Sequence, residues 1–257
     1  MRRIEVCCTS VADVIEAYFG GAIRIELCSA LSCGGVTPSR GLIAEVLATA
    51  ESLRRDAPRP YPFNINVLVR PREGSFCYSG LEIGTILSDI RFCADAGVSG
   101  IVVGALTPEG DIDTENCRKM MEAAKGLDTT FHRAFDTCAD PERALEQIAG
   151  LGFRRLLTSG QKPDAISGAG LIHRMVIQAG DRITIMPGSG ISPENIAEIE
   201  RITGAREFHS TASTLVPDPC MHRVPELGFE ESSVTDGDGR TLVRRTSRSV
   251  VRQLAGE

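Results

Sequence analysis

The feature that most constrains this chain is a regular alternation of short apolar runs with longer amphipathic runs. The apolar runs are short and rich in β-branched residues, so they predict strands rather than helices. Several of them are almost continuously apolar, which is typical of parallel strands covered on both faces. The predicted strands are 4–8, 23–28, 63–69, 100–104, 129–132, 154–158, 183–187 and 206–210.

The amphipathic segments between these runs predict helices. From Val11 to Tyr18 the apolar residues follow the i, i+3, i+4, i+7 spacing of one helical face. A fifth helix is expected to begin at Asp140, which is followed by Pro141, and Ser192 before a proline gives the same start signal for a seventh. The other helices are predicted at 40–54, 80–96, 113–125, 164–179 and 240–254.

Eight strands alternating with eight helices over 257 residues predict one α/β domain spanning 1–257. The length is typical of a single-domain (β/α)8 TIM barrel, and an open doubly wound sheet is the alternative. One irregular, proline-containing stretch at 211–239 precedes the last predicted helix. We expect it to be a surface excursion whose length suits a lid or an interface.

Composition excludes several classes of partner. The net charge is −6 and no block of Lys or Arg stands out, which argues against a nucleic-acid partner. No apolar run of membrane-spanning length and no charged-then-apolar leader occurs, so neither a membrane span nor secretion is expected.

The nine cysteines are scattered and form no C-x-x-C, which disfavours a disulfide framework and a zinc ribbon. A reducing cytoplasm is the simplest location.

The first two predicted strands each carry a glutamate two residues before a cysteine. Glu5 precedes Cys7, and Glu26 precedes Cys28. Side chains alternate along a strand, so each glutamate faces the same way as its cysteine, and the two pairs are expected side by side. Free cysteines are commonly small buried hydrophobic residues, but a buried carboxylate is costly unless it is paired.

Further polar residues lie where the predicted strands end, which is where the active sites of barrels are built. Arg70 and Arg72 are expected either to hold an anion or to neutralise the two glutamates. Gly188 and Gly190 precede a helix start and suit a phosphate-binding loop, although glycines also serve simply to turn a loop. The expected substrate- or anion-binding set is Asn66, Arg70, Arg72, Arg133, Asp136, Ser159, Gly188 and Gly190.

Two histidines, His132 and His209, also fall at strand ends. Together with Glu5 and Glu26 they are the candidates for general acid and base catalysis. Two metal sites are conceivable, and the sequence leaves both open. Cys7 and Cys28, with Cys8 or Cys33, would suit Cu(I), whereas the glutamates and histidines would suit Mn, Fe or Zn.

Several strings of the sequence together resemble one known family, CutC, which is described as a copper homeostasis protein family. They include RIELCSAL, VRPR, TFHRAFD and LLTSG, and the likeness runs from residue 4 to about 213. The resemblance implies a cytoplasmic TIM barrel that forms homo-oligomers, dimers or tetramers, and that binds copper through Cys7 and Cys28. The chain departs from the family pattern at a few places, where Ile23 replaces an Asp and Ser189 replaces a glycine.

These observations support two main functions. The first is a cytoplasmic copper-homeostasis protein that binds copper ion, as the resemblance implies. The second is an enzyme, an isomerase, epimerase or lyase, that acts on a small sugar-like or phosphorylated molecule at the C-terminal mouth of the barrel. A purely structural role is disfavoured, because a barrel filled with apolar layers would be more stable than one with buried ion pairs.

Overall fold

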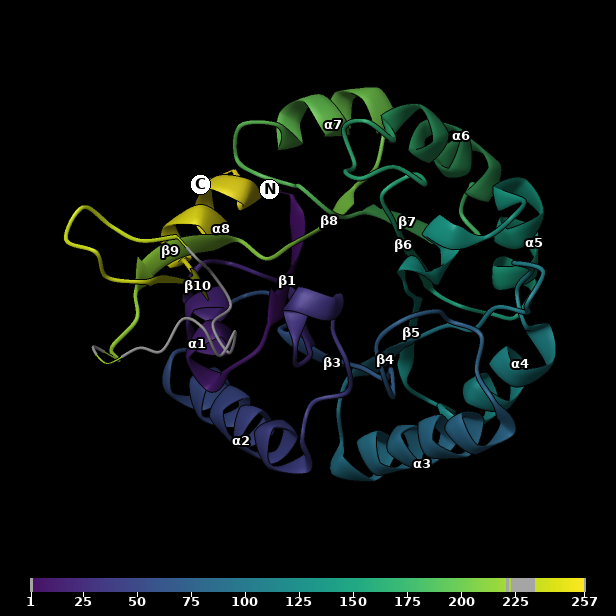
Figure 1. Ribbon diagram of the computed structural model, residues 1–257, viewed down its shortest axis with the longest axis horizontal. Helices are drawn as coiled ribbons and strands as arrows, with labels where there is room; N and C mark the ends of the chain where they lie inside the picture. Colours follow the sequence, from purple (N-terminus) through teal and green to yellow (C-terminus); the bar gives the residue numbers. More distant parts are fainter. Residues whose placement is uncertain (1, 221, 223–233, 257) are drawn as a thin grey trace.

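A ring of parallel strands surrounded by helices forms the molecule (Figure 1). The structure is a computed structural model that describes residues 2–220, 222 and 234–256. The strand order β7-β6-β5-β4-β3-β2-β1-β8 makes the first and last strands of the barrel neighbours. The predicted (β/α)8 barrel is therefore confirmed and the doubly wound alternative is wrong. Its strands are β1 (Arg3–Cys8), β2 (Arg24–Leu27), β3 (Asn64–Leu68), β4 (Gly100–Val103), β5 (Asp128–Phe131), β6 (Arg155–Thr158), β7 (Thr184–Pro187) and β8 (Glu207–Ser210).

The helices cover the outside of the ring. Asp140 caps α5 as predicted, by accepting from the backbone N–H of Arg143. The helix predicted to begin at Ser192 begins one turn later, at Ile196. The Asn195 side chain accepts from the Ser192 N–H and stabilises a turn before the helix. The helices are α1 (Val11–Phe19), α2 (Arg40–Asp56), α3 (Gly80–Ala96), α4 (Thr114–Ala123), α5 (Pro141–Gly150), α6 (Ala169–Ala179), α7 (Ile196–Thr203) and α8 (Arg248–Ala255). Among the described residues, no helix is long and apolar enough to cross a membrane.

One seam of the barrel lacks a ladder of backbone hydrogen bonds. Within the described chain every other pair of neighbouring strands is hydrogen-bonded, but β7 and β8 are not. β7 ends at Pro187, which has no N–H to donate. Gly188 follows, and a Cβ there would lie 2.5 Å from Leu157 Cδ1, so any larger residue would force this side chain to shift.

The C-terminal part differs from its prediction. Residues 240–254 were expected to be one helix, but β10 (Leu242–Thr246) precedes the short helix α8. β10 pairs antiparallel with β9 (Ser213–Pro217), and the buried Asp13 of α1 accepts from the Thr246 N–H at 3.0 Å. The helix prediction is wrong in its first half, because these residues pair with β9, a strand that lies at the start of the predicted 211–239 excursion and is distant in the sequence. Residues 221 and 223–233 of that predicted excursion lie outside the described residues.

The sheet separates two different interiors. Between the sheet and the helices lies a large apolar core to which β1 and β2 contribute Ile4, Val6, Ile25 and Leu27. Inside the ring, the alternate residues of the strands are mostly polar. The apolar cluster there is small and consists of Cys7, Cys28, Leu68 and Val102. The alternation thus places the predicted site residues of β1 and β2 inside the barrel.

Two short 3₁₀ helices sit in loops that follow strands. The first, η1 (Leu31–Cys33), follows β2, and the second, η2 (Arg133–Thr137), follows β5. Because both loops leave the carboxyl ends of their strands, they help to form the mouth of the barrel.

Candidate functional site

A layer of buried ion pairs crosses the barrel below the site. Arg24 of β2 donates to Glu5 of β1 and, through Nη2, to Glu207 Oε2 of β8 at 2.7 Å. Arg155 of β6 donates from Nε to the same Glu207 oxygen at 3.0 Å, and from Nη2 to Asp128 at 2.6 Å. Each buried charge in this layer therefore has an opposite charge beside it.

The sequence suggested Arg70 and Arg72 as possible partners for the buried glutamates, and the structure gives that role to other residues. Glu5 contacts Arg24 and also His209, whose Nδ1 lies 2.8 Å from Glu5 Oε1. Burial alone would raise the pKa of Glu5, but Arg24 and His209 outweigh it and hold the pKa at about 2. Glu5 is thus an ionised carboxylate that orients His209.

The second glutamate lies on the other side of the same histidine. His209 Nε2 is 3.8 Å from Glu26 Oε2. Burial lowers the pKa of His209, but the two carboxylates raise it by more, so the net shift is upward. Burial raises the pKa of Glu26 above its ordinary value. The Glu5–His209–Glu26 row is therefore an assembly in which a proton can be held or passed.

Two thiols adjoin this row. The sulfur atoms of Cys7 and Cys28 are 3.3 Å apart, and Cys7 Sγ lies 3.6 Å from Glu26 Oε2. The hydrogen bond with Cys28 raises the pKa of Cys7 well above its ordinary value, and burial and the nearby Glu26 add to the shift. Both thiols are fully or almost fully buried.

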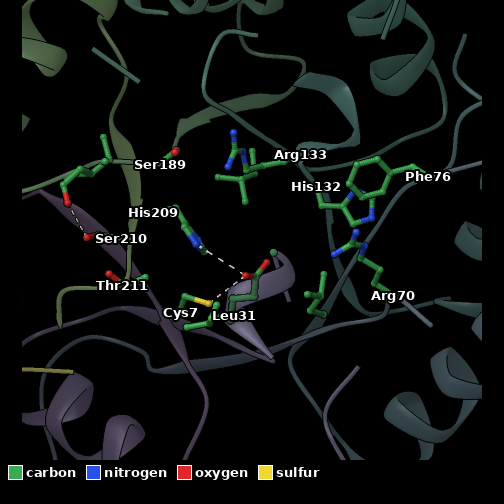
Figure 2. A pocket seen from close by; sticks show the side chains of 16 residues that line it. Cys7, Leu31, Arg70, Phe76, His132, Arg133, Ser189, His209, Ser210 and Thr211 are labelled. Carbon is green, nitrogen blue, oxygen red and sulfur yellow. Dashed lines mark hydrogen bonds and ion pairs between the residues drawn. The ribbon is translucent and has the colours of Figure 1, made fainter. Parts of the chain in front are cut away.

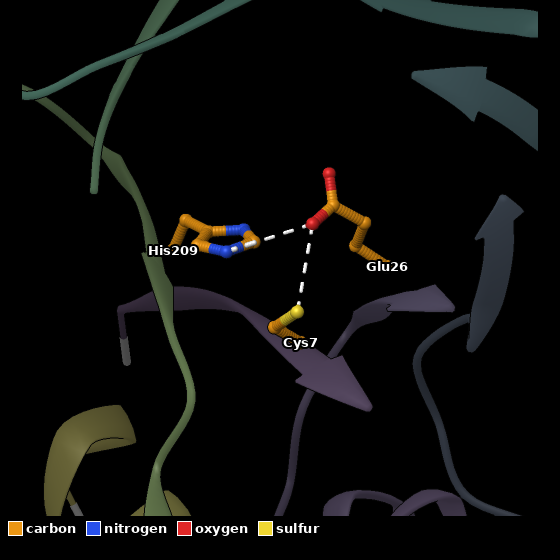
Figure 3. A group of neighbouring side chains, drawn as sticks. All are labelled: Cys7, Glu26 and His209. Atoms are coloured by element: carbon orange, nitrogen blue, oxygen red, sulfur yellow. Dashed lines mark hydrogen bonds and ion pairs between the residues drawn. The ribbon is translucent and has the colours of Figure 1, made fainter. Parts of the chain in front are cut away.

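Three of these residues also form a candidate metal site. One ligand atom each from Cys7, Glu26 and His209 lies within 4.8 Å of the others (Figure 3). Cys28 supplies a second sulfur next to the first. The two sulfur donors make this set suitable for a soft metal ion.

A cavity of about 320 Å³ lies above these groups. Cys7 and His209 lie on one side of it, while Arg70, Phe76 and His132 lie on the other (Figure 2). The lining residues are Cys7, Glu26, Leu31, Gly34, Leu68, Arg70, Phe76, His132, Arg133, Leu157, Ser189, Gly190, Ile191, His209, Ser210 and Thr211. The cavity is thus large enough for a small polar molecule and is lined by Cys7, Glu26 and His209, with Cys28 buried directly beside Cys7.

The far wall is built around Arg70. Its Nη1 donates to the backbone carbonyls of Cys33 and Gly35, and its Nη2 to that of Gly74. His132 lies beside it, and both side chains contact Phe76. Burial, together with the Arg70 charge, lowers the pKa of His132 to about 3, so this histidine is neutral.

Other predicted site residues form hydrogen bonds within and between the loops around the cavity. Asp136 accepts from Arg133 Nε at 2.7 Å, and from the N–H and hydroxyl of Ser159. These bonds join the loop after β5 to the loop after β6. Arg133 and Gly190 line the cavity, whereas Gly188 packs against Leu157 and His209.

Arg72 and Asn66 are among the predicted residues that lie outside the cavity lining. Arg72 pairs with Glu82 of α3 and donates to backbone carbonyls of its own loop, such as that of Cys77 at 2.9 Å. Asn66 is fully buried inside the barrel near Gly100, where a Cβ would lie 2.6 Å from Asn66 Oδ1. The structure therefore does not bring Arg72 to the thiols or to Glu26.

Several lining residues were not predicted. Phe76 belongs to the REGSF string after Arg70, and its aromatic ring beside two arginines was the available signal. Leu31 and Thr211 carry no such signal, because their place depends on loop conformations. Ser189 was noted only as a replacement for glycine, and it has a positive φ of 75° while its hydroxyl donates to the Pro163 carbonyl.

Comparisons with known proteins agree on one family. The CutC family profile matches residues 2–214. A CutC family protein of Parabacteroides distasonis is 46% identical over 234 residues, which are 91% of this chain and 92% of that protein. One of Chromobacterium violaceum is 40% identical over 251 residues, which are 98% of this chain and 96% of that protein. A solved structure from Streptococcus agalactiae, named as a copper homeostasis protein CutC, has a TM-score of 0.75 and 32% identity, and the match covers 82% of this chain and 99% of that one.

Proposed function

The chain belongs to the CutC family, and we propose that it binds Cu(I) as cargo at the base of its barrel cavity. One observation carries the proposal: Cys7 and Cys28 hold their sulfur atoms 3.3 Å apart at that base. Thiolates are the soft ligands that Cu(I) prefers. The name of the Streptococcus agalactiae relative, a copper homeostasis protein, supports the same metal.

The neighbouring groups suit this role. Both thiols must lose their protons to bind the ion, and the Glu26 carboxylate beside Cys7 can accept one of them. Glu26 and His209 can then supply further oxygen and nitrogen ligands. We also propose a cytoplasmic location, because all nine cysteines are free thiols, a state that a reducing compartment maintains. A homo-oligomer, dimer or tetramer, is part of the proposal and is tested by light scattering.

Anaerobic Cu(I) titration against a colorimetric chelator tests the copper proposal. We expect one Cu(I) per chain for the natural protein and a loss of affinity of about tenfold or more in Cys7→Ser and in Cys28→Ser. Cys220→Ser is the matched control, because Cys220 is exposed and does not line the cavity. Unchanged affinity in both cavity variants, or equal losses in all three, would remove the proposal.

A second function is favoured by a separate observation, which is the Glu5–His209–Glu26 row, because its His209 and Glu26 line the cavity. A buried carboxylate with a raised pKa beside a histidine is the arrangement of a general acid or base. We therefore propose as the alternative an isomerase, epimerase or lyase that acts on a small sugar-like or phosphorylated molecule.

Proton exchange at carbon tests the alternative. A set of small sugar phosphates and hydroxy acids is incubated with the protein in D₂O, and loss of C–H signals is followed by NMR. We expect exchange with the natural protein and a loss of at least about 100-fold in Glu26→Gln, because general acid–base groups contribute that much. Glu82→Gln is the control, since Glu82 pairs with Arg72 outside the cavity lining. Equal exchange rates in the two variants would exclude Glu26 as the acid or base.

A further inference from the structure

We propose that the Arg70–His132 wall of the cavity is a subsite for an oxyanion, the phosphate or carboxylate group of a small ligand. The inference rests on the alternative enzyme function, because it names the chemical group that the substrate must carry. It does not depend on copper, since it concerns the wall opposite Cys7 and His209 (Figure 2).

The charge of Arg70 is the first argument. Arg70 is 5% exposed, and among the described residues no carboxylate forms an ion pair with it. Two other strongly buried arginines differ from it, since Arg24 and Arg155 each contact two carboxylates. A buried guanidinium whose described partners are neutral carbonyls and an aromatic ring retains an uncompensated positive charge. That charge adjoins the cavity and therefore attracts an anion to it.

Unused hydrogen-bond donors are the second argument. The Ala134 N–H donates to His132 Nδ1 at 3.3 Å, so the proton of the neutral ring is on Nε2. His132 is 4% exposed, and its Nε2 is buried with no hydrogen-bond partner among the described residues. Arg70 Nε is likewise buried with no hydrogen-bond partner among the described residues. Two neighbouring side chains that line the cavity thus each carry an N–H group without an acceptor.

The wall is also held in place before any ligand arrives. The His132 ring lies 4.8 Å from the Phe76 ring, and Arg70 Cζ lies 4.9 Å from the same ring. The carbonyls of Cys33, Gly35 and Gly74 fix the guanidinium from two loops. Donors that are already oriented lose little freedom when they bind an anion.

The position of the subsite fits the acid–base row across the cavity. Glu26 and His209 line the same cavity as Arg70 and His132. His209 lies on the opposite side from these two residues (Figure 2), and Glu26 Oε2 lies 3.8 Å from His209 Nε2. A ligand anchored by a phosphate or carboxylate at Arg70 would present its carbon chain to Glu26. The substrate class that follows is a small polar molecule with one oxyanion group at its end.

Isothermal titration of the full chain with inorganic phosphate and with acetate, at constant ionic strength set with chloride, tests the inference. We expect saturable binding of at least one of the two, and the tighter one identifies the group as phosphate or carboxylate. Arg70→Gln should abolish binding. His132→Phe keeps the aromatic contact with Phe76 but removes the donor, and should weaken binding about tenfold.

Arg72→Gln is the matched control, because Arg72 is an arginine of the same loop that lies outside the cavity lining. It should bind the anion as the natural protein does. If Arg70→Gln disturbs its loops, His132→Phe still decides the matter. No saturable binding of either anion, or equal affinity in His132→Phe and the natural protein, would overturn the inference.

The outcomes also separate this inference from the function on which it rests. Anion binding that survives in Glu26→Gln while no carbon exchange is found would keep the subsite and remove the acid–base function. Glu26-dependent exchange without anion binding at Arg70 would keep the function and remove the subsite.

Discussion

Arg24 of β2 and Glu207 of β8 form an ion pair of 2.7 Å that reaches past β1 inside the barrel. Arg155 of β6 contacts the same Glu207 oxygen at 3.0 Å, from the other side of β7. One carboxylate thus links strands on both sides of the seam where β7 and β8 lack a backbone ladder. The ion pair between Arg155 and Glu207 therefore connects β6 to β8 across a seam that has no backbone hydrogen bonds.

Arg24→Met should lower the free energy of unfolding by about 3–5 kcal/mol, because it leaves Glu5 and Glu207 buried with less compensation. Urea denaturation at pH 7 measures the loss. Arg182→Met removes an exposed ion pair with Glu146 and should have little effect. Similar midpoints for the two variants would show that the buried layer adds no more than a surface pair.

His132→Gln should make stability less sensitive to mild acid. Burial and Arg70 lower the folded pKa of His132 to about 3, whereas the unfolded value is about 6.5. The unfolded chain therefore binds this proton first, and stability falls as the pH drops from about 6.5 toward 3. Between pH 7 and pH 5 the natural protein should lose about 2 kcal/mol more than the variant, as urea titrations at the two pH values measure. Parallel losses in both proteins would contradict a neutral buried His132.

Cu(I) affinity should rise with pH. The hydrogen bond with Cys28 and burial raise the pKa of Cys7, so this thiol is protonated at pH 7 and must release its proton to bind the metal. The apparent affinity should then increase about tenfold per pH unit for each proton released. Chelator competition at pH 6, 7 and 8 measures the slope, with the chelator's own pH dependence subtracted. An affinity independent of pH would contradict a Cys7 thiol that releases its proton when it binds the metal.

Gly168→Ala should destabilise the loop beside the cavity by about 1–3 kcal/mol, because a Cβ there would lie 1.9 Å from the Ser159 carbonyl oxygen. Thermal and urea unfolding measure the change. Gly170→Ala is the matched control two residues on, since nothing lies within 4 Å of a Cβ at that helical position. The control should be neutral or more stable by up to about 1 kcal/mol. Equal stability of the two variants would contradict the close approach of Gly160 and Gly168.

Asp13→Ala should loosen the attachment of β10. Asp13 is 4% exposed and accepts from the N–H groups of Thr246 and Thr9, so its removal leaves buried donors without acceptors. We expect a loss of about 2–3 kcal/mol and faster amide exchange at Thr246. Asp13→Asn retains one acceptor oxygen and should lose less. Unchanged exchange at Thr246 in Asp13→Ala would show that other contacts hold the strand.

The barrel was predictable because its signals are local. Apolar runs such as 100–104 and the start signal at Asp140 depend on neighbours along the chain, and the structure confirms both. β10 was missed because a strand of five residues is recognisable mainly through its partner, and its partner β9 lies at the start of the 211–239 stretch that was expected to be irregular. Local pattern cannot show a pairing of that kind.

The site was predictable in part for the same reason. Strand alternation placed Glu5 and Cys7 on one face, and the order of the strands brought Glu26 and Cys28 beside them. It did not show that Arg24, rather than Arg70, would neutralise Glu5, because that choice depends on side-chain lengths across the barrel. Arg70 was expected at the cavity and lines it, but its bonds to three backbone carbonyls depend on loop conformations that the sequence pattern does not specify.

The ion-pair layer limits how a ligand can enter and leave the barrel. Arg24, Glu207 and Arg155 fill the interior below the cavity and are at most 9% exposed, so the described barrel is plugged at that level. Whatever enters the cavity must leave by the mouth through which it came. Substitutions at the rim should therefore speed or slow arrival and departure together, and change residence time more than equilibrium occupancy.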